Sequence, residues 1–237
     1  VPEEDRWALA PIPAGEAPRY AEVRWRLFAA FRPDEECGDP LCHMAVAANG
    51  TGLLPELPVG HRTLVRWSEL PEVLCPVEEG GVLRTRGAID LPTIIRAPGE
   101  VSGGGTVFLV VSGSNGHLPS AITQSGIPSN SRETATLISR PRHLCGSETA
   151  LSMVCVGLLG VPTGSATVLP RVDIVARAAR DFRAGEVVGP MGTTGWTRDL
   201  RASLVPAFRV AAGSPLPFFM LEGNRLAVDV PAGAVFT

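Results

Sequence analysis

The sequence predicts an α+β protein in which a mixed sheet with a few helices is followed by a small all-β module. Residues 106–112 form a continuous run of apolar and β-branched residues that is typical of a buried strand. Asp39 and Pro40 form a helix start, with a capping residue and a proline at the first helical position. After residue 169, short apolar segments alternate with turn residues, a pattern that favours small β-structure.

Length and composition allow this division. The chain has 237 residues, of which 45% are hydrophobic, enough for one large domain or two smaller ones. We expect an N-terminal arm and lead-in element over residues 1–38, an α+β region over 39–168 and the β module over 169–237. No stretch approaches the roughly 18 apolar residues of a membrane span, and the acidic N-terminus has no apolar signal core. We therefore expect a cytoplasmic protein with no membrane partner.

The charged residues exclude several kinds of chemistry. All 21 basic residues are Arg, so the lysine amine of Schiff-base catalysis and of a P-loop is absent. A net charge of −3 argues against a nucleic-acid partner. The five Cys form no CxxC pair, so we expect reduced thiols and no metal site. A ligand set of Cys37, Cys42 and His43 is the weaker alternative.

The first half of the chain is predicted element by element. Residues 1–19 contain four Pro and predict an extended arm. Residues 20–31 alternate like a strand at first and end like a helix, so both alternatives stay open. Residues 39–54 predict a helix, because four apolar residues recur at helical spacing. These are Leu41, Met44, Ala45 and Ala48.

The next elements lead to the centre of the chain. Residues 57–74 are predicted as a connector with a short helical piece around Glu69, and residues 76–91 as a loop rich in carboxylates, Gly and Arg. After the strand at 106–112, a long polar loop reaches residue 132. Residues 133–139 then predict a second strand.

Residues 140–152 hold the strongest candidate site, because a His, a carboxylate, two Arg, a Cys and hydroxyls occur together at the start of an apolar helix. If this helix begins near Gly146, Glu148 lies in its first turn, where the helix dipole favours a carboxylate. His143 is the candidate general acid or base, because histidine titrates near neutrality. Glu148 would orient it or act as the complementary acid. The structural alternative is a buried helix with a capping Glu and a hydrogen-bonded His.

Four further residues complete the candidate site. Arg140 or Arg142 would hold a substrate carboxylate or enolate oxygen through a bidentate contact. Asp90 and His117 are second candidates for substrate binding. A nucleophilic Cys145 is a weaker alternative, since catalytic pairs usually meet through the fold and not along the chain.

Several pieces of the chain occur in a recognisable order: residues 48–53, 78–83, 87–90, 140–144, 148–149 and 160–163, then 178–186 and 226–235 in the tail. Together they resemble the C-terminal half of SAF-domain-containing homoserine-dehydrogenase-like proteins, and the tail pieces resemble the SAF domain, a β-clip module. The resemblance covers roughly residues 40–237. It implies a substrate and dimerisation domain followed by a SAF domain, and a homodimer.

The chain also departs from that family. Its members carry an N-terminal Rossmann domain, whereas this sequence has no GxGxxG motif. The three Gly at 103–105 do not replace that motif. They come before a strand, whereas the phosphate-binding loop of a Rossmann domain comes after a strand. Arg142 stands where the family has an aromatic residue, and the lysines expected for hydride transfer are absent. We therefore expect no cofactor.

The sequence thus favours a cofactor-free enzyme that transfers a proton on a small metabolite in biosynthesis, by isomerisation, dehydration or cyclisation. The codon bias behind the missing Lys suggests an actinobacterial source. One alternative is a non-catalytic binding or partner subunit. Another is an NAD(P)-dependent oxidoreductase that works with a separate nucleotide-binding subunit, and a third is a fragment of a full dehydrogenase.

Overall fold

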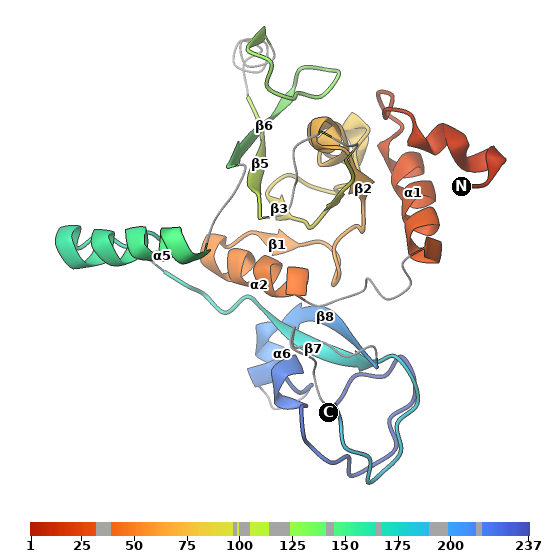
Figure 1. The fold of residues 1–237 in the computed structure, drawn as a ribbon, viewed down its shortest axis with the longest axis vertical. Coiled ribbons are helices and arrows are strands. Elements are labelled where there is room, and N and C mark those ends of the chain that lie inside the picture. Colours follow the sequence, from red (N-terminus) through yellow and green to blue (C-terminus); the bar gives the residue numbers. More distant parts are fainter. Residues whose placement is uncertain are drawn as a thin grey trace. The chain divides into compact units, whose positions relative to one another are not determined.

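The structure is a computed structural model that describes residues 1–31, 39–96, 99, 105–113, 124–140, 145–164, 167–189, 199–211 and 215–237. It divides into two compact units (Figure 1). The first comprises Val1–Phe31, His61–Arg86 and Pro92–Ala166, and the second comprises Arg32–Gly60, Gly87–Leu91 and Thr167–Thr237. Both units combine helices with small sheets, so the predicted α+β class is confirmed.

The first unit begins with the 3-10 helix η1 (Glu3–Leu9) and helix α1 (Ala17–Phe31). Helix α1 decides between the two alternatives for residues 20–31. Its buried residues Ala17, Tyr20, Ala21 and Arg24 recur at helical spacing, so one face packs inward. The strand alternative rested on an alternation that places Arg24 among surface residues. In the structure the Arg24 side chain is only 1% exposed.

A short parallel sheet follows in the first unit. Strand β2 (Leu64–Val65) pairs with β4 (Thr93–Ile94), and the 3-10 helix η2 (Trp67–Glu69) leads into α3 (Leu70–Val73). The short helical piece expected around Glu69 is therefore confirmed. The 3-10 helix η3 (Val77–Glu79) lies at the start of the predicted loop over residues 76–91.

The antiparallel pair β5 (Val107–Ser112) and β6 (Ala135–Arg140) confirms both central strands. Its two faces differ. Ala135 and Leu137 are buried, whereas Leu109 and Ile138, which lie opposite each other, are more than half exposed. The expectation that this strand is buried is therefore wrong for one face of the pair, which packs on one side only.

Helix α5 (Cys145–Val154) and the π-helical turn η4 (Cys155–Leu159) form the helix expected after residue 146. The alternative of a buried helix is wrong, because its large apolar residues from Leu151 to Leu159 are all more than half exposed. Glu148 lies in the first turn, as expected.

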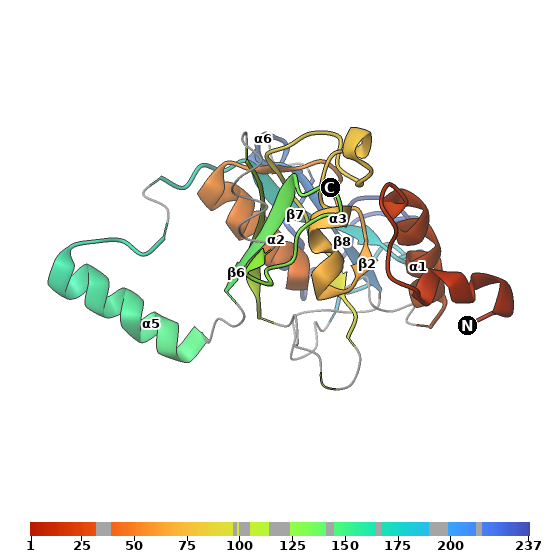
Figure 2. The same ribbon diagram turned by 90° about the horizontal axis from the view of Figure 1, so that it is seen from above.

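The second unit is built around the antiparallel pair β7 (Val172–Ala178) and β8 (Leu200–Pro206), with α2 (Asp39–Thr51) beside it (Figures 1 and 2). The predicted face of α2 is confirmed: Leu41, Met44, Ala45 and Ala48 are buried in one core with both strands. Phe182, Phe218 and Phe236 complete this core from the C-terminal part of the chain.

Smaller elements finish the second unit. Strand β1 (Leu54–Pro55) pairs in parallel with β3 (Ala88–Ile89), and α6 (Ala207–Ala211) and η5 (Phe218–Met220) are short helical turns. The short strands expected after residue 180 occur as single bridges, such as Phe182 with Val230 and Val187 with Arg225. The Pro and Gly of the intervening turns keep them short.

Candidate functional site

The structure describes three of the six predicted site residues. Arg140, Glu148 and Asp90 lie within the described ranges. Arg142, His143 and His117 lie outside them, so their positions stay predictions. Arg140 and Glu148 belong to the first unit, and Asp90 belongs to the second.

Arg140 and Glu148 form an ion pair. Arg140 is the last residue of β6, and Glu148 lies in the first turn of α5. The Arg140 side chain is 64% exposed and that of Glu148 is 30% exposed. The α5 dipole favours the ionised carboxylate at this position, and the guanidinium balances its charge. We did not predict this ion pair from the sequence, since we expected Arg140 to bind a substrate and Glu148 to contact His143.

Arg140 is of a residue type that binds anionic groups, and in this structure its Nη2 is paired with Glu148. A guanidinium offers five N–H donors in one plane and matches a carboxylate in geometry. The pair is accessible to solvent, so a small molecule can reach it. His143, five residues before Glu148 and three after Arg140, belongs to the connection between the two elements.

Asp90 has a local structural contact. It follows β3, and its Oδ1 accepts a hydrogen bond from the backbone N–H of Leu91 at 2.6 Å. Gly60 packs against the same carboxylate, since a Cβ at this position would lie 2.7 Å from Asp90 Oδ1. A side chain at residue 60 would displace this carboxylate, and the φ of +69° there also favours glycine.

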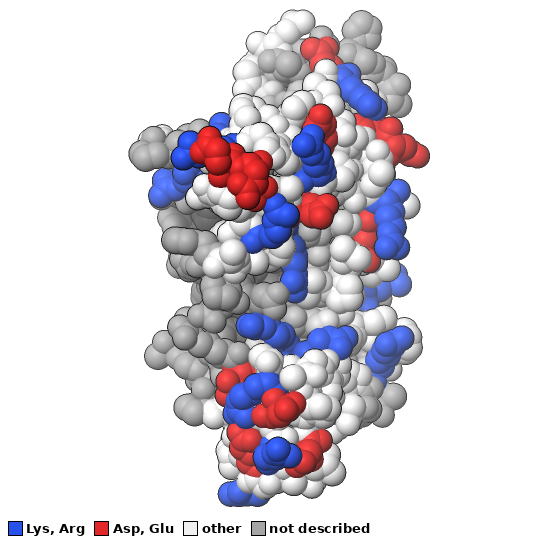
Figure 3. All heavy atoms as spheres, turned by 90° about the vertical axis from the view of Figure 1, so that its right-hand side faces the viewer, with Lys and Arg blue, Asp and Glu red and all other residues white. Residues whose placement is uncertain are grey.

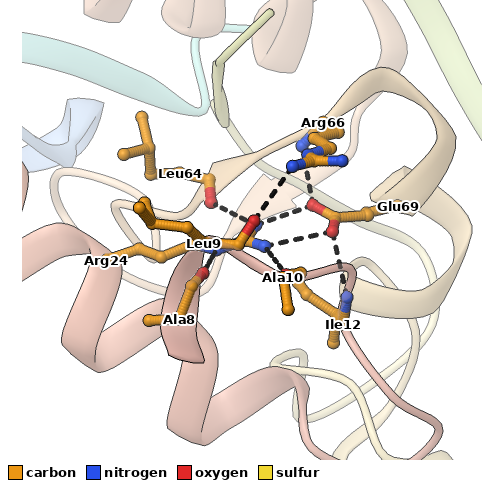
Figure 4. A network of polar contacts seen from close by, with 8 residues as sticks. All are labelled: Ala8, Leu9, Ala10, Ile12, Arg24, Leu64, Arg66 and Glu69. Atoms are coloured by element: carbon orange, nitrogen blue, oxygen red, sulfur yellow. Dashed lines mark hydrogen bonds and ion pairs between the residues drawn. The ribbon is translucent and has the colours of Figure 1, made fainter. Parts of the chain in front are cut away.

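The most extensive polar network in the described first unit was not predicted. Arg24 on α1 is 1% exposed, and Glu69 at the end of η2 is 6% exposed (Figure 4). Arg24 Nη1 and Nη2 donate to the two carboxylate oxygens of Glu69 at 2.6 and 3.1 Å. Nε donates to the carbonyl of Ala8 at 2.7 Å. The remaining two bonds reach the carbonyls of Leu64 at 3.1 Å and Ala10 at 2.8 Å.

This network is structural. All five N–H groups of Arg24 are used, and Glu69 also accepts bonds from the backbone N–H groups of Ile12 and Arg66. Burial alone would raise the pKa of Glu69, but the hydrogen bonds from Arg24 and the two backbone groups outweigh it and hold this pKa below its usual range. The pair therefore fixes the N-terminal segment to β2 and η2, with no donor left for a substrate. The sequence signal was an Arg at helical spacing from Ala17, Tyr20 and Ala21.

A second buried group surrounds Cys75. Glu72, 7% exposed, accepts bonds from the backbone N–H of Ser131 at 2.7 Å and from its hydroxyl at 2.9 Å. The Cys75 thiol lies 3.3 Å from the carbonyl oxygen of Glu72. Burial, with the nearby carboxylates of Glu72 and Glu79, raises the pKa of Cys75 to about 11. This thiol is therefore neutral and unsuited to nucleophilic attack.

Surface charge is mixed. On the face shown in Figure 3, basic and acidic side chains occur together. Ion pairs at the protein surface include Arg6 with Glu3 and Arg180 with Glu186. Within the described residues, no group of three or more His, Cys, Asp or Glu could hold a metal ion. None of the described helices is long and apolar enough to cross a membrane.

Comparison with known proteins gives one family. The model of the oxidoreductase DRL catalytic domain matches residues 20–149, more than half of the chain, from helix α1 to the first turn of α5. A comparison with curated proteins gave no match. The matched range contains Arg140, Glu148 and the Arg24–Glu69 pair. The resemblance to dehydrogenase-like proteins is thereby confirmed at the level of a catalytic domain, and the chain belongs to the family of the oxidoreductase DRL catalytic domain.

Proposed function

We propose that this chain is a catalytic domain that transfers a proton on a small metabolite carrying a carboxylate. The observation that carries this proposal is the Arg140–Glu148 ion pair at the start of α5, inside the range that matches the family. Arg140 would bind the substrate carboxylate, with Arg142 as the second candidate for this role. His143 would move the proton, and Glu148 would hold His143 in position or act as the complementary acid.

The reaction is an isomerisation, dehydration or cyclisation that needs no cofactor. The described residues do not fit a dinucleotide-binding fold, because the parallel pairs β1–β3 and β2–β4 contain two residues per strand. The sequence has neither a GxGxxG nor a Lys. Proton transfer and charge stabilisation by Arg are therefore the chemistry that these residues can supply.

An oxidoreductase is the second candidate, because the family model carries that description. In this version the same residues would bind the substrate and transfer its proton, while a separate domain or subunit would hold a nicotinamide nucleotide. The finer family assignment, a homoserine-dehydrogenase-like substrate domain followed by a SAF domain over 169–237, is part of the proposal. The single bridges between turns in that region support it.

Proton exchange in heavy water tests the proposal. The protein is incubated with a panel of small hydroxy- and keto-carboxylates, and deuterium incorporation is followed by NMR without nucleotide and with NAD(H) or NADP(H). We expect incorporation without nucleotide. His143→Ala should lose at least about 100-fold, in line with the usual size of acid–base effects, and Arg140→Ala should weaken substrate binding. Arg183→Ala, which removes an exposed ion pair in the second unit, is the matched control.

Each outcome separates the alternatives. Turnover that requires added nucleotide and a second protein would support the oxidoreductase version. If the wild-type protein binds a carboxylate but exchanges no proton, and Arg140→Ala abolishes that binding, the chain is a non-catalytic binding subunit. Exchange at the wild-type rate in both site variants would show that the chemistry lies elsewhere in the chain.

A further inference from the structure

Two stretches of the second unit repeat one sequence pattern. Residues 177–187, which we call the first turn, and residues 225–235, the second turn, both follow the pattern Arg-x-Ala-x-Asp-x-x-Ala-Gly-x-Val. Six of the eleven positions are identical, at a constant spacing of 48 residues. Self-similarity at one spacing is the sequence signature of an internal repeat.

The backbone bonds between the two turns are reciprocal. The N–H of Phe182 donates to the carbonyl of Val230, and the N–H of Val230 donates to the carbonyl of Phe182, both at 2.9 Å. The two segments therefore lie side by side (Figure 1). Four further bonds form two more exchanged pairs: Gly185 to Leu226 with Gly233 to Ala178, and Leu226 to Glu186 with Ala178 to Ala234. Contacts that recur when the partners are exchanged are those of a two-fold axis.

The aspartates of the pattern are exchanged in the same way. Asp181 Oδ1 accepts a hydrogen bond from the backbone N–H of Ala232 at 2.8 Å. Asp229 Oδ1 accepts one from the backbone N–H of Ala184 at 2.7 Å. Each carboxylate thus satisfies a backbone donor of the opposite turn and none of its own turn.

The arginines and glycines complete the exchange. Arg177 Nη1 donates to the carbonyl of Gly233 at 3.4 Å, and Arg225 Nη1 donates to the carbonyl of Gly185. Gly185 and Gly233 have φ values of +85° and +82°, a conformation that favours glycine. The identical Arg, Asp, Ala and Gly of the pattern therefore all have roles in the contact between the turns.

We propose that the two turns form a reciprocal clasp, in which each turn is completed by the other and neither closes alone. The last residues of the chain then act as a strap that closes the C-terminal part of the second unit. The edge contact between the buried rings of Phe182 and Phe236, 5.5 Å apart, lies in the same closed core. The clasp lies outside residues 20–149, so it gives this part of the chain a role that does not depend on the proposed reaction.

Amide hydrogen exchange of the full chain, followed by NMR, tests the coupling. Asp181→Ala removes the acceptor of Ala232 alone, yet we expect the amides of both Ala232 and Ala184 to exchange at least about 10-fold faster, because the turns open together. Asp229→Ala should accelerate the same two amides. Asp173→Ala, which removes a carboxylate bonded to the N–H of the next residue, is the control and should change neither amide. Acceleration of only the amide that lost its acceptor would overturn the clasp.

A proline substitution tests the equivalence of the turns. The repeat places Arg183 at the position of Pro231, and the Arg183 N–H donates only to the surface carboxylate of Glu186 among the described residues. Proline is accepted where the backbone already suits it, so Arg183→Pro should shift the melting temperature by less than roughly 3 °C. Arg201→Pro in β8, opposite Arg177, should lower it by roughly 6 °C or more. Equal losses in the two proline variants would show that the turns are not equivalent.

Discussion

Glu69 shows how strongly one buried carboxylate can determine stability. It is the sole acidic partner of Arg24 in the described network, and both side chains are almost fully buried. Glu69→Gln leaves the Arg24 cation uncompensated, so we expect a loss of about 3–5 kcal/mol in the free energy of unfolding. Urea unfolding followed by tryptophan fluorescence measures it, because Trp7, Trp25 and Trp67 lie in the same unit.

The contribution of Glu69 to the free energy of unfolding should depend on pH in a definite direction. The pKa of Glu69 is lowered in the folded protein, so its contribution is complete above the pKa of the unfolded chain and is lost as pH falls through the folded value. The difference between wild type and Glu69→Gln should therefore shrink as pH is lowered from 7 towards the acid range. Glu3→Gln, in an exposed ion pair with Arg6, is the control and should cost less than about 1 kcal/mol. An equal loss in both variants would show that burial is not the cause.

Cys75 is predicted to be unreactive in the folded protein. Burial and two carboxylates raise its pKa to about 11, so its thiolate fraction at pH 8 is small. Alkylation by iodoacetamide at this pH should be at least about 100-fold slower than for the same cysteine in guanidinium chloride, as followed by mass spectrometry of the Cys75 peptide. Equal rates in the two conditions would mean that the thiol is accessible and ionised.

At this scale the sequence singled out Arg140 and Glu148 at the start of α5, though not as partners of each other, and missed Arg24 and Glu69. Arg140 and Glu148 are eight residues apart, so a local pattern was enough to place both in one candidate site. Arg24 and Glu69 are 45 residues apart, and their pairing depends on the packing of α1 against η2. A period-2 alternation in residues 20–26 further concealed the buried face of α1.

The turn after η3 depends on two glycines. Gly80 has a φ of +96°, and a Cβ on Gly81 would lie 2.1 Å from the carbonyl oxygen of Cys75. Gly81→Ala must displace backbone, so we expect a loss of at least about 2 kcal/mol in the free energy of unfolding. Gly164→Ala has nothing within 4 Å of the new Cβ and should change stability by less than about 0.5 kcal/mol. Similar unfolding midpoints for the two variants would contradict the tight turn.

Elements were predicted better than their surroundings. The positions of α2, β5, β6 and β7 follow from local periodicity, caps and β-rich runs, which act over a few residues. The open face of β5–β6 and the exposed apolar residues of α5 and η4 do not follow from such patterns. A continuous apolar run predicts that residues are covered, and it does not say whether the cover comes from the same chain.

For the whole molecule, the second unit is assembled from three separate stretches of chain. Helix α2 shares its core with β7 and β8, more than 120 residues later. No local signal reports such a contact, because the helix face alone does not identify its partner. That residues 169–237 fold separately from the residues before them therefore stays a prediction. The core that α2 shares with β7 and β8 indicates how to test it.

Point substitutions and a truncation would show whether α2 and the C-terminal part fold together. Met44 is 3% exposed in the shared core, so Met44→Ala should cost about 2–5 kcal/mol, whereas Val46→Ala, at a 73% exposed position of the same helix, should have almost no effect. A chain ending at residue 166 would leave Leu41, Met44, Ala45 and Ala48 without β7 and β8. We expect it to bind a hydrophobic dye strongly and to lose protection of α2 amides from hydrogen exchange. If α2 amides keep their protection in the truncated chain, the residues before 167 hold that helix by themselves, and the C-terminal part is an independent module.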